Sequence, residues 1–161
     1  MEISKPSLAW TLVISAQEIS HALGSHKRER GADNGCDFPN HAGLLFWAIY
    51  YLEKTLSLRL GRASTIPDED ITVPLPGGSQ MPACPGLAYF QLHVKLAGLS
   101  GRIYTELYSA HSLTEAAESR QAKVQALSRE AREIQEAAAL NYVSTPFPEV
   151  LCSVIRTISH G

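Results

Sequence analysis

A long apolar stretch that ends at a proline-rich segment constrains the fold of this 161-residue chain most strongly. Residues 41–60 contain no proline and are apolar on every side over their first half, which predicts a helix that is buried all round and ends at Gly61 and Arg62. Five of the nine prolines then lie between Gly61 and Pro85, where a helix cannot persist. We expect an ordered loop there. Four apolar side chains that alternate with polar residues would pack it against the rest of the protein: Ile66, Ile71, Val73 and Leu75.

The polar side of this helix is narrow and lies in its second half. It consists of Glu53, Lys54, Ser57 and Arg59. The large side chains Trp47, Tyr50 and Tyr51 precede it, and each carries a polar group that needs a hydrogen-bond partner when it is buried. The pattern predicts a helix that is mostly core and has little solvated surface.

Helical spacing also marks the beginning of the chain. Pro6 suits the first turn of a helix, and Gly24 suits its end because glycine readily takes the left-handed conformation. Between them, apolar residues recur at gaps that place them on one helical face: Leu8, Leu12, Ala16, Ile19 and Leu23. This stripe predicts the buried face of a first helix, followed by a charged loop from Ser25 to Asn40.

Two further helices are predicted after the proline-rich loop. Residues 87–109 carry a buried stripe of Leu92, Leu96, Leu99, Ile103 and Leu107. Gly98 and Gly101 weaken a helix and are expected there only if another helix packs closely on that face. Ser112 and Glu115 form the pattern of a capping box, so we expect a fourth helix to begin there and extend to about Leu140. Its apolar seam is Leu113, Ala117, Val124, Leu127, Ala131, Ile134 and Ala138, and its opposite face holds Glu118, Arg129, Arg132, Glu133 and Glu136.

These elements predict an all-α fold, an irregular helical bundle of about four main helices with a long proline-rich ordered loop. Residues 1–140 form the domain, and residues 141–161 form a tail or one short helix from Glu149 to Ser159. The net charge of −2 and the pI near 6.3 give no global basic field to attract nucleic acid. The basic run from His26 to Arg30 is interrupted by a glutamate and is predicted to be a solvated loop rather than a phosphate-binding patch.

Few residues are spaced for chemistry. Cys36, Cys84 and Cys152 lack a Cys-x-x-Cys pair, which favours reduced thiols in an intracellular protein. The pairs His21 with His26 and Cys36 with His41 are each five residues apart, not the four that share a helical face, so we expect no metal site. No nucleophile elbow occurs, and no secretory signal or bilayer-length apolar run is present. We therefore do not expect an enzyme.

The acidic run from Asp68 to Asp70 has a structural interpretation. Neighbouring carboxylates in one loop point in different directions, and no glycine-punctuated calcium loop surrounds them. We expect Asp68 or Asp70 to accept hydrogen bonds from loop amides, or to pair with Arg59 or Arg62. Gly77 and Gly78 lack the context of a phosphate loop and predict a turn. The leucine stripes are expected to be core, with a partner-binding groove as the alternative.

The sequence from Phe46 to Pro76 resembles the central motif of the regulatory domain of fungal zinc-cluster transcription factors, also called the middle homology or xylanolytic activator-type domain. Weaker similarity extends over about residues 8–135. Glu53-Lys54 replaces the usual Asp-Arg of that family and keeps both charges, whereas Ser25 and Ile134 replace a leucine and a tryptophan. The resemblance assigns a structural role to the motif residues, which are Phe46, Trp47, Tyr50, Glu53, Lys54, Leu56, Ser57, Arg59, Gly61, Arg62, Asp68, Asp70, Pro74 and Pro76.

The resemblance also implies a function. Domains of this family lie in the middle of long nuclear regulators of transcription, whose DNA contact is a separate module in which six cysteines bind two zinc ions. That module is not in this sequence, so we expect a partial regulatory domain that acts in the nucleus without a cofactor, zinc or direct DNA contact. Its expected partners are proteins of the transcription machinery, an inducer of unspecified chemistry, or a second copy through uncovered apolar faces. The alternative is a free-standing helical module that binds a ligand or a protein, and a helical enzyme ranks last.

Overall fold

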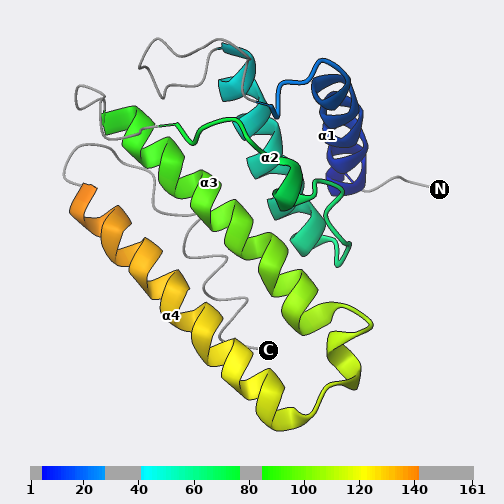
Figure 1. Ribbon diagram of the computed structural model, residues 1–161, viewed down its shortest axis with the longest axis vertical. Coiled ribbons are helices and arrows are strands. Elements are labelled where there is room, and N and C mark those ends of the chain that lie inside the picture. The colour runs from blue at the N-terminus through cyan, green and yellow to red at the C-terminus, as the bar shows by residue number, and fades with distance from the viewer. Residues whose placement is uncertain (1–4, 28–40, 77–84, 142–161) are drawn as a thin grey trace.

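The computed structural model describes residues 5–27, 41–76 and 85–141, and this part of the chain is all-α, as the sequence predicts (Figure 1). Its four main helices are α1 (Lys5–Ala22), α2 (His41–Arg59), α3 (Pro85–Ile103) and α4 (Ala117–Asn141). Three short helical turns join them: η1 (Asp68–Asp70), η2 (Tyr104–Tyr108) and η3 (Ser112–Thr114). No strand occurs in these described ranges.

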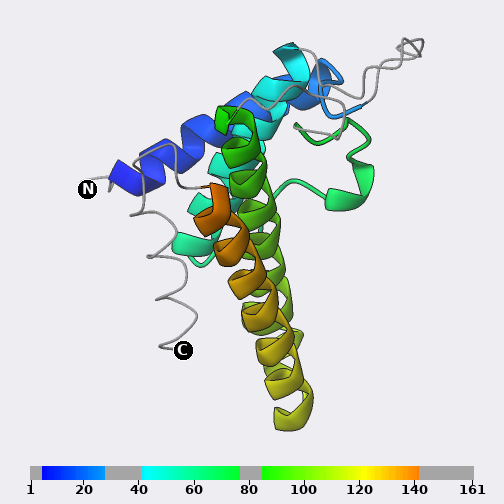
Figure 2. The ribbon, with the colours of Figure 1, turned by 90° about the vertical axis from the view of Figure 1, so that its left-hand side faces the viewer.

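The helices pack in chain order. α2 lies between α1 and α3, and α4 runs antiparallel to α3 along most of its length (Figures 1 and 2). Figure 2 shows α1, α2 and the loop after α2 gathered at one end of the molecule, while α3 and α4 extend beyond them as a two-helix arm. The shape is therefore an irregular bundle in which α3 touches both halves.

Two apolar clusters correspond to these halves. The first joins α2, the proline-rich loop and α3 through Phe46, Trp47, Tyr50, Ile66, Val73, Val94 and Ala97. The second joins α3, η2 and α4 through Leu96, Leu99, Ile103, Leu107, Leu127, Ala131 and Ile134. Helix α3 contributes opposite faces to the two clusters. All five residues of the predicted stripe, Leu92 included, are buried.

Both predicted glycine helix ends are present. Gly24 has φ +74° and Gly61 has φ +63°. At the end of α2, the N–H of Arg62 donates to the carbonyl of Ser57 at 2.8 Å and that of Gly61 donates to the carbonyl of Leu58 at 3.0 Å. The same pair of bonds follows α1, so each helix closes with a Schellman motif that satisfies its last carbonyl groups.

The predicted buried face of α1 is wrong. Its stripe faces solvent, with exposed fractions of 51% for Leu8, 63% for Leu12, 63% for Ile19 and 78% for Leu23, while Ala16 is only partly covered. The residues of α1 that are buried are Gln17 and Ser20. Periodicity identifies a stripe but not what covers it, and α1 packs on α2 through its more polar side.

Helix α2 begins and ends almost as predicted, but it is not buried all round. Leu45 and Leu52 are 61% and 45% exposed, because α1, α3 and the loop cover the other sides of the helix. Its supposed polar side is instead the most interior part: Glu53 and Ser57 have no exposed surface and Lys54 has 4%. Among the four predicted polar residues only Arg59 faces solvent.

The connection from α3 to α4 also differs from the prediction. The α-helical part of α3 ends at Ile103, and Tyr104–Tyr108 continue as a π-helical turn. The predicted capping box does not form, since the Ser112 hydroxyl donates to the carbonyl of Ser109 at 2.8 Å, and the Glu115 carboxylate binds Lys123 at 2.6 Å. Helix α4 therefore begins later, at Ala117, which itself is exposed, as is Leu113. The rest of the predicted seam lies inward, and the five predicted charged residues of the opposite face lie outward.

Several predictions lie outside the described residues. They are the short helix of residues 149–159, the turn at Gly77 and Gly78, the basic run beyond Lys27, and the three cysteines. The proline-rich loop is described as far as Pro76, and there it is ordered and packed on the helices.

Candidate functional site

The Glu53 carboxylate is the centre of a buried hydrogen-bond network. Its Oε1 accepts hydrogen bonds from the backbone N–H of Thr65 at 2.8 Å, from the Thr65 hydroxyl at 3.2 Å and from the Ser57 hydroxyl at 3.0 Å. Its Oε2 accepts a bond from the Ser64 hydroxyl at 2.7 Å. A carboxylate without exposed surface needs such donors, because they replace the water lost on burial. The loop that follows α2 supplies three of these four donor groups and is thereby tied to the helix.

The same network reaches α1. The indole Nε1 of Trp10 donates to the Ser57 hydroxyl at 3.0 Å, and the Arg62 guanidinium lies over the Trp10 ring, 4.4 Å from its centroid. These contacts explain why α1 turns its more polar side toward α2. They also place Arg62 against a ring instead of a carboxylate.

Lys54 is the second buried charge of α2. Its Nζ lies 2.9 Å from the carbonyl oxygen of Ile66 and 2.9 Å from Oδ1 of Asp68. The Tyr50 hydroxyl donates to the same Asp68 oxygen at 2.9 Å. Burial, together with the Asp68 carboxylate beside it, raises the pKa of Tyr50 far above its ordinary value.

Among the alternatives expected for Asp68 and Asp70, pairing of Asp68 with Arg59 or Arg62 is not what the structure shows, because Asp68 binds Tyr50 and Lys54 instead. The acidic loop turns back over the middle of α2, where Tyr50 and Lys54 project, and not over the arginines at its end. Asp68 remains 44% exposed, so solvent screens the ion pair and its net contribution is modest. Asp70 is exposed.

Two glycines of α3 make room for these side chains. A Cβ added to Gly98 would lie 3.2 Å from the Tyr50 hydroxyl, and one added to Gly101 would lie 2.9 Å from Cδ of Lys54. This is the close helix approach that the two glycines predict. The closeness lets Tyr50 and Lys54 pass between α2 and α3 to reach the loop.

The remaining motif residues complete the attachment of the loop. Trp47 is buried, and its indole Nε1 donates to the carbonyl of Pro74 at 2.9 Å. Phe46 packs edge-on to Trp47, with ring centroids 5.3 Å apart. Pro76 is fully buried and Leu56 is half-buried. The sequence motif thus corresponds in space to one helix and the loop that folds back over it.

His26 is buried, although the basic run to which it belongs is predicted from the sequence to be a solvated loop. Only 3% of it is exposed, and its carbonyl accepts the N–H groups of Thr72 and Val73, each at 3.0 Å. Its ring stacks on that of His21 with centroids 3.9 Å apart, and its Nδ1 is buried without a hydrogen-bond partner in the described part of the chain. Burial, and next the neighbouring His21, lower the pKa of His26 below 6.5.

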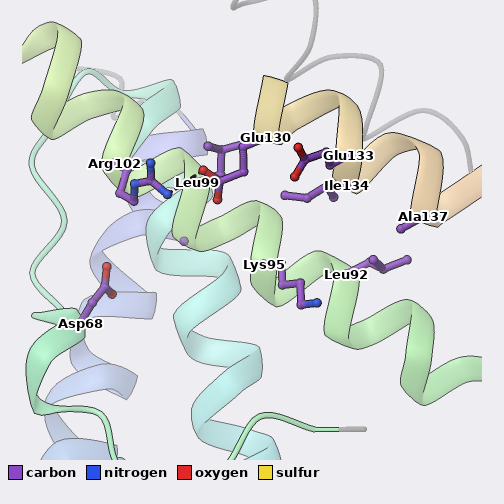
Figure 3. Close-up of a pocket in the computed structure, with 10 residues that line it drawn as sticks. Asp68, Leu92, Lys95, Leu99, Arg102, Glu130, Glu133, Ile134 and Ala137 are labelled. Carbon is purple, nitrogen blue, oxygen red and sulfur yellow. Dashed lines mark hydrogen bonds and ion pairs between the residues drawn. The ribbon is translucent and has the colours of Figure 1, made fainter. Parts of the chain in front are cut away.

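A shallow groove lies between α3, α4 and the tip of the loop (Figure 3). It has a volume of about 480 Å³ and an apolar floor that includes Leu92, Leu99 and Ile134. Figure 3 shows Arg102 of α3 directed toward Glu130 of α4, and the two are joined at 2.7 Å. Lys95 and Asp68 lie at the groove, so apolar surface is bordered there by both signs of charge.

In residues 5–27, 41–76 and 85–141, no three His, Cys, Asp or Glu side chains come together in a way that could hold a metal ion. In the same ranges, no helix is long and apolar enough to cross a membrane. The polar network is arranged to hold a loop on a helix.

Comparison with known proteins identifies the family to which the motif belongs. The family described as "Fungal specific transcription factor domain" matches residues 3–134. The chain belongs to this family. The resemblance noted in the sequence is thus confirmed, and the domain is a regulatory transcription factor segment, not a member of an enzyme family.

Individual relatives agree with this assignment. An "ABC-transporter-regulating transcription factor" of Aspergillus fumigatus is 31% identical over 65% of this chain and 13% of its own length. "Protein STB5" of Saccharomyces cerevisiae is 40% identical over 40% of this chain and 9% of its own length. A "Negative regulator of pleiotropic drug resistance STB5" of Candida glabrata is 29% identical over 63% of the chain and 10% of its length. The chain thus spans only about a tenth of these relatives, and no solved structure matches it.

Proposed function

We propose that this chain is the regulatory, non-DNA-contacting segment of a fungal zinc-cluster transcription factor and that it acts in the nucleus. The family match over residues 3–134 carries the proposal, because the family is described as a transcription factor domain and the Aspergillus fumigatus relative is named as a transcription factor. The net charge of −2 is consistent with a segment that does not hold DNA itself. It works without catalysis and without a cofactor, by presenting helices to protein partners of the transcription machinery.

The network around Glu53 and Lys54 supports a role in presenting a fixed surface. Two buried charged side chains of α2 hold the backbone and side chains of residues 64–68, so the loop and the helices form one body. A partner that contacts the loop and α3 together then meets a surface whose parts are already in place. Such preorganisation lowers the entropy lost on binding.

A fusion experiment tests this function. The chain would be joined to a heterologous DNA-binding module in yeast and compared with the module alone on a reporter gene. We expect the fusion to change reporter output, whereas the chain without the module leaves the reporter unchanged. Glu53→Ala, which removes the centre of the network, should abolish the effect, and Glu118→Ala, on the exposed face of α4, should preserve it.

Two results would contradict the proposal. One is a folded, nuclear fusion whose reporter output equals that of the module alone. The other is a chain that acts on the reporter without any DNA-binding module, since this would require direct DNA contact. Immunoblotting and nuclear fractionation establish that each fusion is present at the same level.

The groove between α3 and α4 favours a second candidate, a helical module that binds an amphipathic ligand. An apolar floor with charged edges is typical of small-molecule sites. A fluorescent apolar anion such as anilinonaphthalene sulfonate would serve as the probe. Saturable binding to the folded chain that is lost in Ala137→Trp, which fills the groove from α4, would support this candidate, and binding that Ala137→Trp leaves unchanged would refute it.

A further inference from the structure

The loop that leaves α2 carries an exposed threonine whose hydroxyl contacts a buried charge. Thr65 is exposed, whereas the Glu53 carboxylate that it binds has no exposed surface. The Thr65 hydroxyl donates to Oε1 of Glu53 at 3.2 Å, which is longer than most hydrogen bonds between oxygens. It is the longest of the four bonds to Glu53, so this hydroxyl is held less firmly than the other donors.

The residues around Thr65 present it in a form that a protein kinase can bind. Residues 62–67 lie outside every helix, so this segment can enter a kinase cleft in an extended conformation without breaking helical hydrogen bonds. Arg62 and Ala63 are exposed as well. Arg62 lies three residues before Thr65, and Arg59 lies six residues before it. These arginines suit a kinase whose substrate groove carries carboxylates, because guanidinium and carboxylate groups form bidentate hydrogen bonds.

The Arg62 side chain is available for such a contact. Its guanidinium lies over the Trp10 ring, 4.4 Å from the centroid, and the residue is exposed. An exposed contact between a cation and a ring is weaker than a charge-assisted bidentate bond to a carboxylate. Arg62 can therefore exchange the Trp10 ring for a carboxylate of a kinase.

Thr105 provides a comparison within the same chain. It is also exposed, and Arg102 precedes it by the same three residues. Thr105 lies in the π-helical turn η2, however, where its hydroxyl donates to the carbonyl of Gly101 at 3.1 Å. Arg102 is already joined to Glu130 at 2.7 Å. The arginine spacing is the same at both threonines, and the local structure favours Thr65.

We propose that Thr65 is a phosphorylation site for a protein kinase that recognises arginine three residues before the acceptor, and that phosphorylation detaches the loop from α2. In the transfer, the Thr65 oxygen forms a bond to the γ-phosphorus of ATP while the bond from that phosphorus to the bridging oxygen of ADP breaks. The hydroxyl proton passes to the catalytic aspartate of the kinase, and ADP leaves. The site adds a means of control to the proposed regulatory role and does not depend on it.

The charge of the phosphate opposes the network around Glu53. A phosphothreonine carries about −1.5 to −2 charges at pH 7, and its bridging oxygen lies 3.2 Å from the Glu53 carboxylate in the unmodified protein. That oxygen also loses its proton and donates no hydrogen bond. Like charges this close repel strongly when one of them is buried. Because Thr65 lies at the surface and Glu53 in the interior, we expect the loop to move away.

Phosphorylation of the purified full chain tests the site. The chain would be incubated with calmodulin-dependent protein kinase II and ATP, and the modified residue would be located by mass spectrometry. Arginine also precedes Ser159 by three residues, so the experiment uses a Ser159→Ala background. We expect one phosphate on Thr65 and none on Thr105. Circular dichroism establishes that the chain is folded before the kinase is added.

Two arginine variants test how the kinase recognises the loop. Arg62→Ala should lower kcat/KM for phosphorylation of Thr65 about tenfold or more, because it removes a charge-assisted contact with the kinase. Arg102→Ala is the matched control and should leave kcat/KM unchanged. A synthetic peptide of residues 57–70 shows whether the kinase accepts this sequence outside the fold.

Hydrogen exchange tests the release of the loop. The N–H of Thr65 donates to Glu53, and that of Ile66 donates to the Ser64 hydroxyl. Phosphorylation should speed amide exchange at residues 65–66 about tenfold or more, because these bonds last only while the loop is attached. Exchange in α4 should stay unchanged. Thr65→Glu should act in the same direction, and Thr65→Gln, which has the same shape without the charge, should act much less.

Each contrary result overturns part of the proposal. A Thr65 that stays unmodified while the kinase phosphorylates the peptide would overturn the site, and so would a peptide that the kinase does not accept. Equal modification of Thr105, or modification of Ser64 in place of Thr65, would overturn the assignment to Thr65. Unchanged exchange in the phosphorylated chain, or equal effects of Thr65→Gln and Thr65→Glu, would overturn the release of the loop.

Discussion

At the scale of single residues, Glu53 shows how a charged side chain becomes part of a core. Its neighbours along α2 give no indication of burial, since Lys54 and Ser57 are also polar. Burial is possible because the loop brings the donors of Ser64 and Thr65 to within hydrogen-bond distance of the carboxylate. The Glu53 carboxylate can therefore stay buried only because these groups donate hydrogen bonds to it.

Glu53→Ala should therefore destabilise the protein severely. The substitution leaves the buried Ser57 hydroxyl and the Thr65 N–H without their acceptor, and each buried unpaired polar group costs about 1–3 kcal/mol. We expect urea denaturation to show a loss of several kcal/mol in the free energy of unfolding. Glu118→Ala on exposed α4 is the control, and an equal effect of both substitutions would contradict this account.

His26 gives the protein a pH dependence of known sign. Burial lowers its pKa in the folded state, so below about pH 6.5 the unfolded chain binds a proton that the folded chain does not. The neighbouring ionisable groups that act on the pKa of His26 are His21 of α1, the adjacent Lys27 and Asp70 of the loop, and of these only Asp70 opposes the shift. The contribution of neutral His26 to the stability of the folded state is complete above the ordinary pKa of histidine. It is lost as the pH falls toward the lowered pKa of His26 in the folded protein.

Thermal melts between pH 5 and pH 8 check this expectation. The melting temperature should fall as the pH is lowered below about 6.5, and His26→Phe, which keeps an aromatic ring against His21, should reduce that fall. His111→Phe is the control because His111 is exposed. A wild-type curve that rises toward acid, or one that His26→Phe leaves unaltered, would exclude His26 as the cause.

At the scale of secondary structure, the end of α2 directs the loop back over the helix. Gly61 reverses the chain in a left-handed conformation, and the Arg62 N–H completes the Schellman motif with Ser57. Ser64, Thr65 and Ile66 then lie beside the side chains that bind them. The helix end and the polar network are thus parts of one arrangement.

Gly61→Val should weaken this helix end. A side chain at Gly61 would meet no atom within 4 Å, so the cost comes from the backbone, and a non-glycine residue in that conformation costs about 1–2 kcal/mol. We expect a lower melting temperature for Gly61→Val and a smaller loss for Gly61→Asn, which tolerates the conformation better. An unchanged melting temperature of Gly61→Val would contradict this prediction, because it would mean that the helix end does not need a glycine at this position.

The contact between α2 and α3 depends on Gly101. Gly101→Ala should gain about 1 kcal/mol of helix propensity, but its Cβ would lie 2.9 Å from Cδ of Lys54. Moving Lys54 breaks its bonds to Ile66 and Asp68, and overpacking of this kind costs about 1–3 kcal/mol. A net loss of stability in chemical denaturation is the expected result. Gly101→Ala in a Lys54→Met background should be tolerated better, and equal losses in both backgrounds would argue against the steric explanation.

At the scale of the whole molecule, the described protein is an all-α body. Its net charge is −2, and no metal-binding group of three or more side chains occurs in the described ranges. Specific DNA affinity depends on phosphate neutralisation by clustered basic residues.

The purified chain alone should bind neither zinc nor DNA tightly. We expect equilibrium dialysis to show no stoichiometric zinc, and gel-shift assays at physiological salt to show no stable DNA complex. The same chain fused to a known zinc-cluster module serves as the positive control for both assays. A stoichiometric zinc ion, or a complex that survives physiological salt, would overturn this expectation.

The sequence by itself determined the features that depend on nearby residues. Helical spacing and glycine placement located the four helices and predicted the ends at Gly24 and Gly61, because these depend on backbone conformation within a few residues. The stripe of α3 was also identified correctly, and the motif from Phe46 to Pro76 indicated the family. These inferences need no knowledge of which distant segments of the chain pack against each other.

Only the tertiary structure decided which surfaces meet. The spacing of α1 could not show that its apolar stripe faces solvent, because the choice depends on Trp10 and Ser57, residues 47 positions apart. The burial of Glu53 and Lys54 and the pairing of Asp68 with Tyr50 and Lys54 arise in the same way, from a loop that folds back over its own helix. Periodicity records which residues share a face, whereas packing between distant segments determines whether that face is inside.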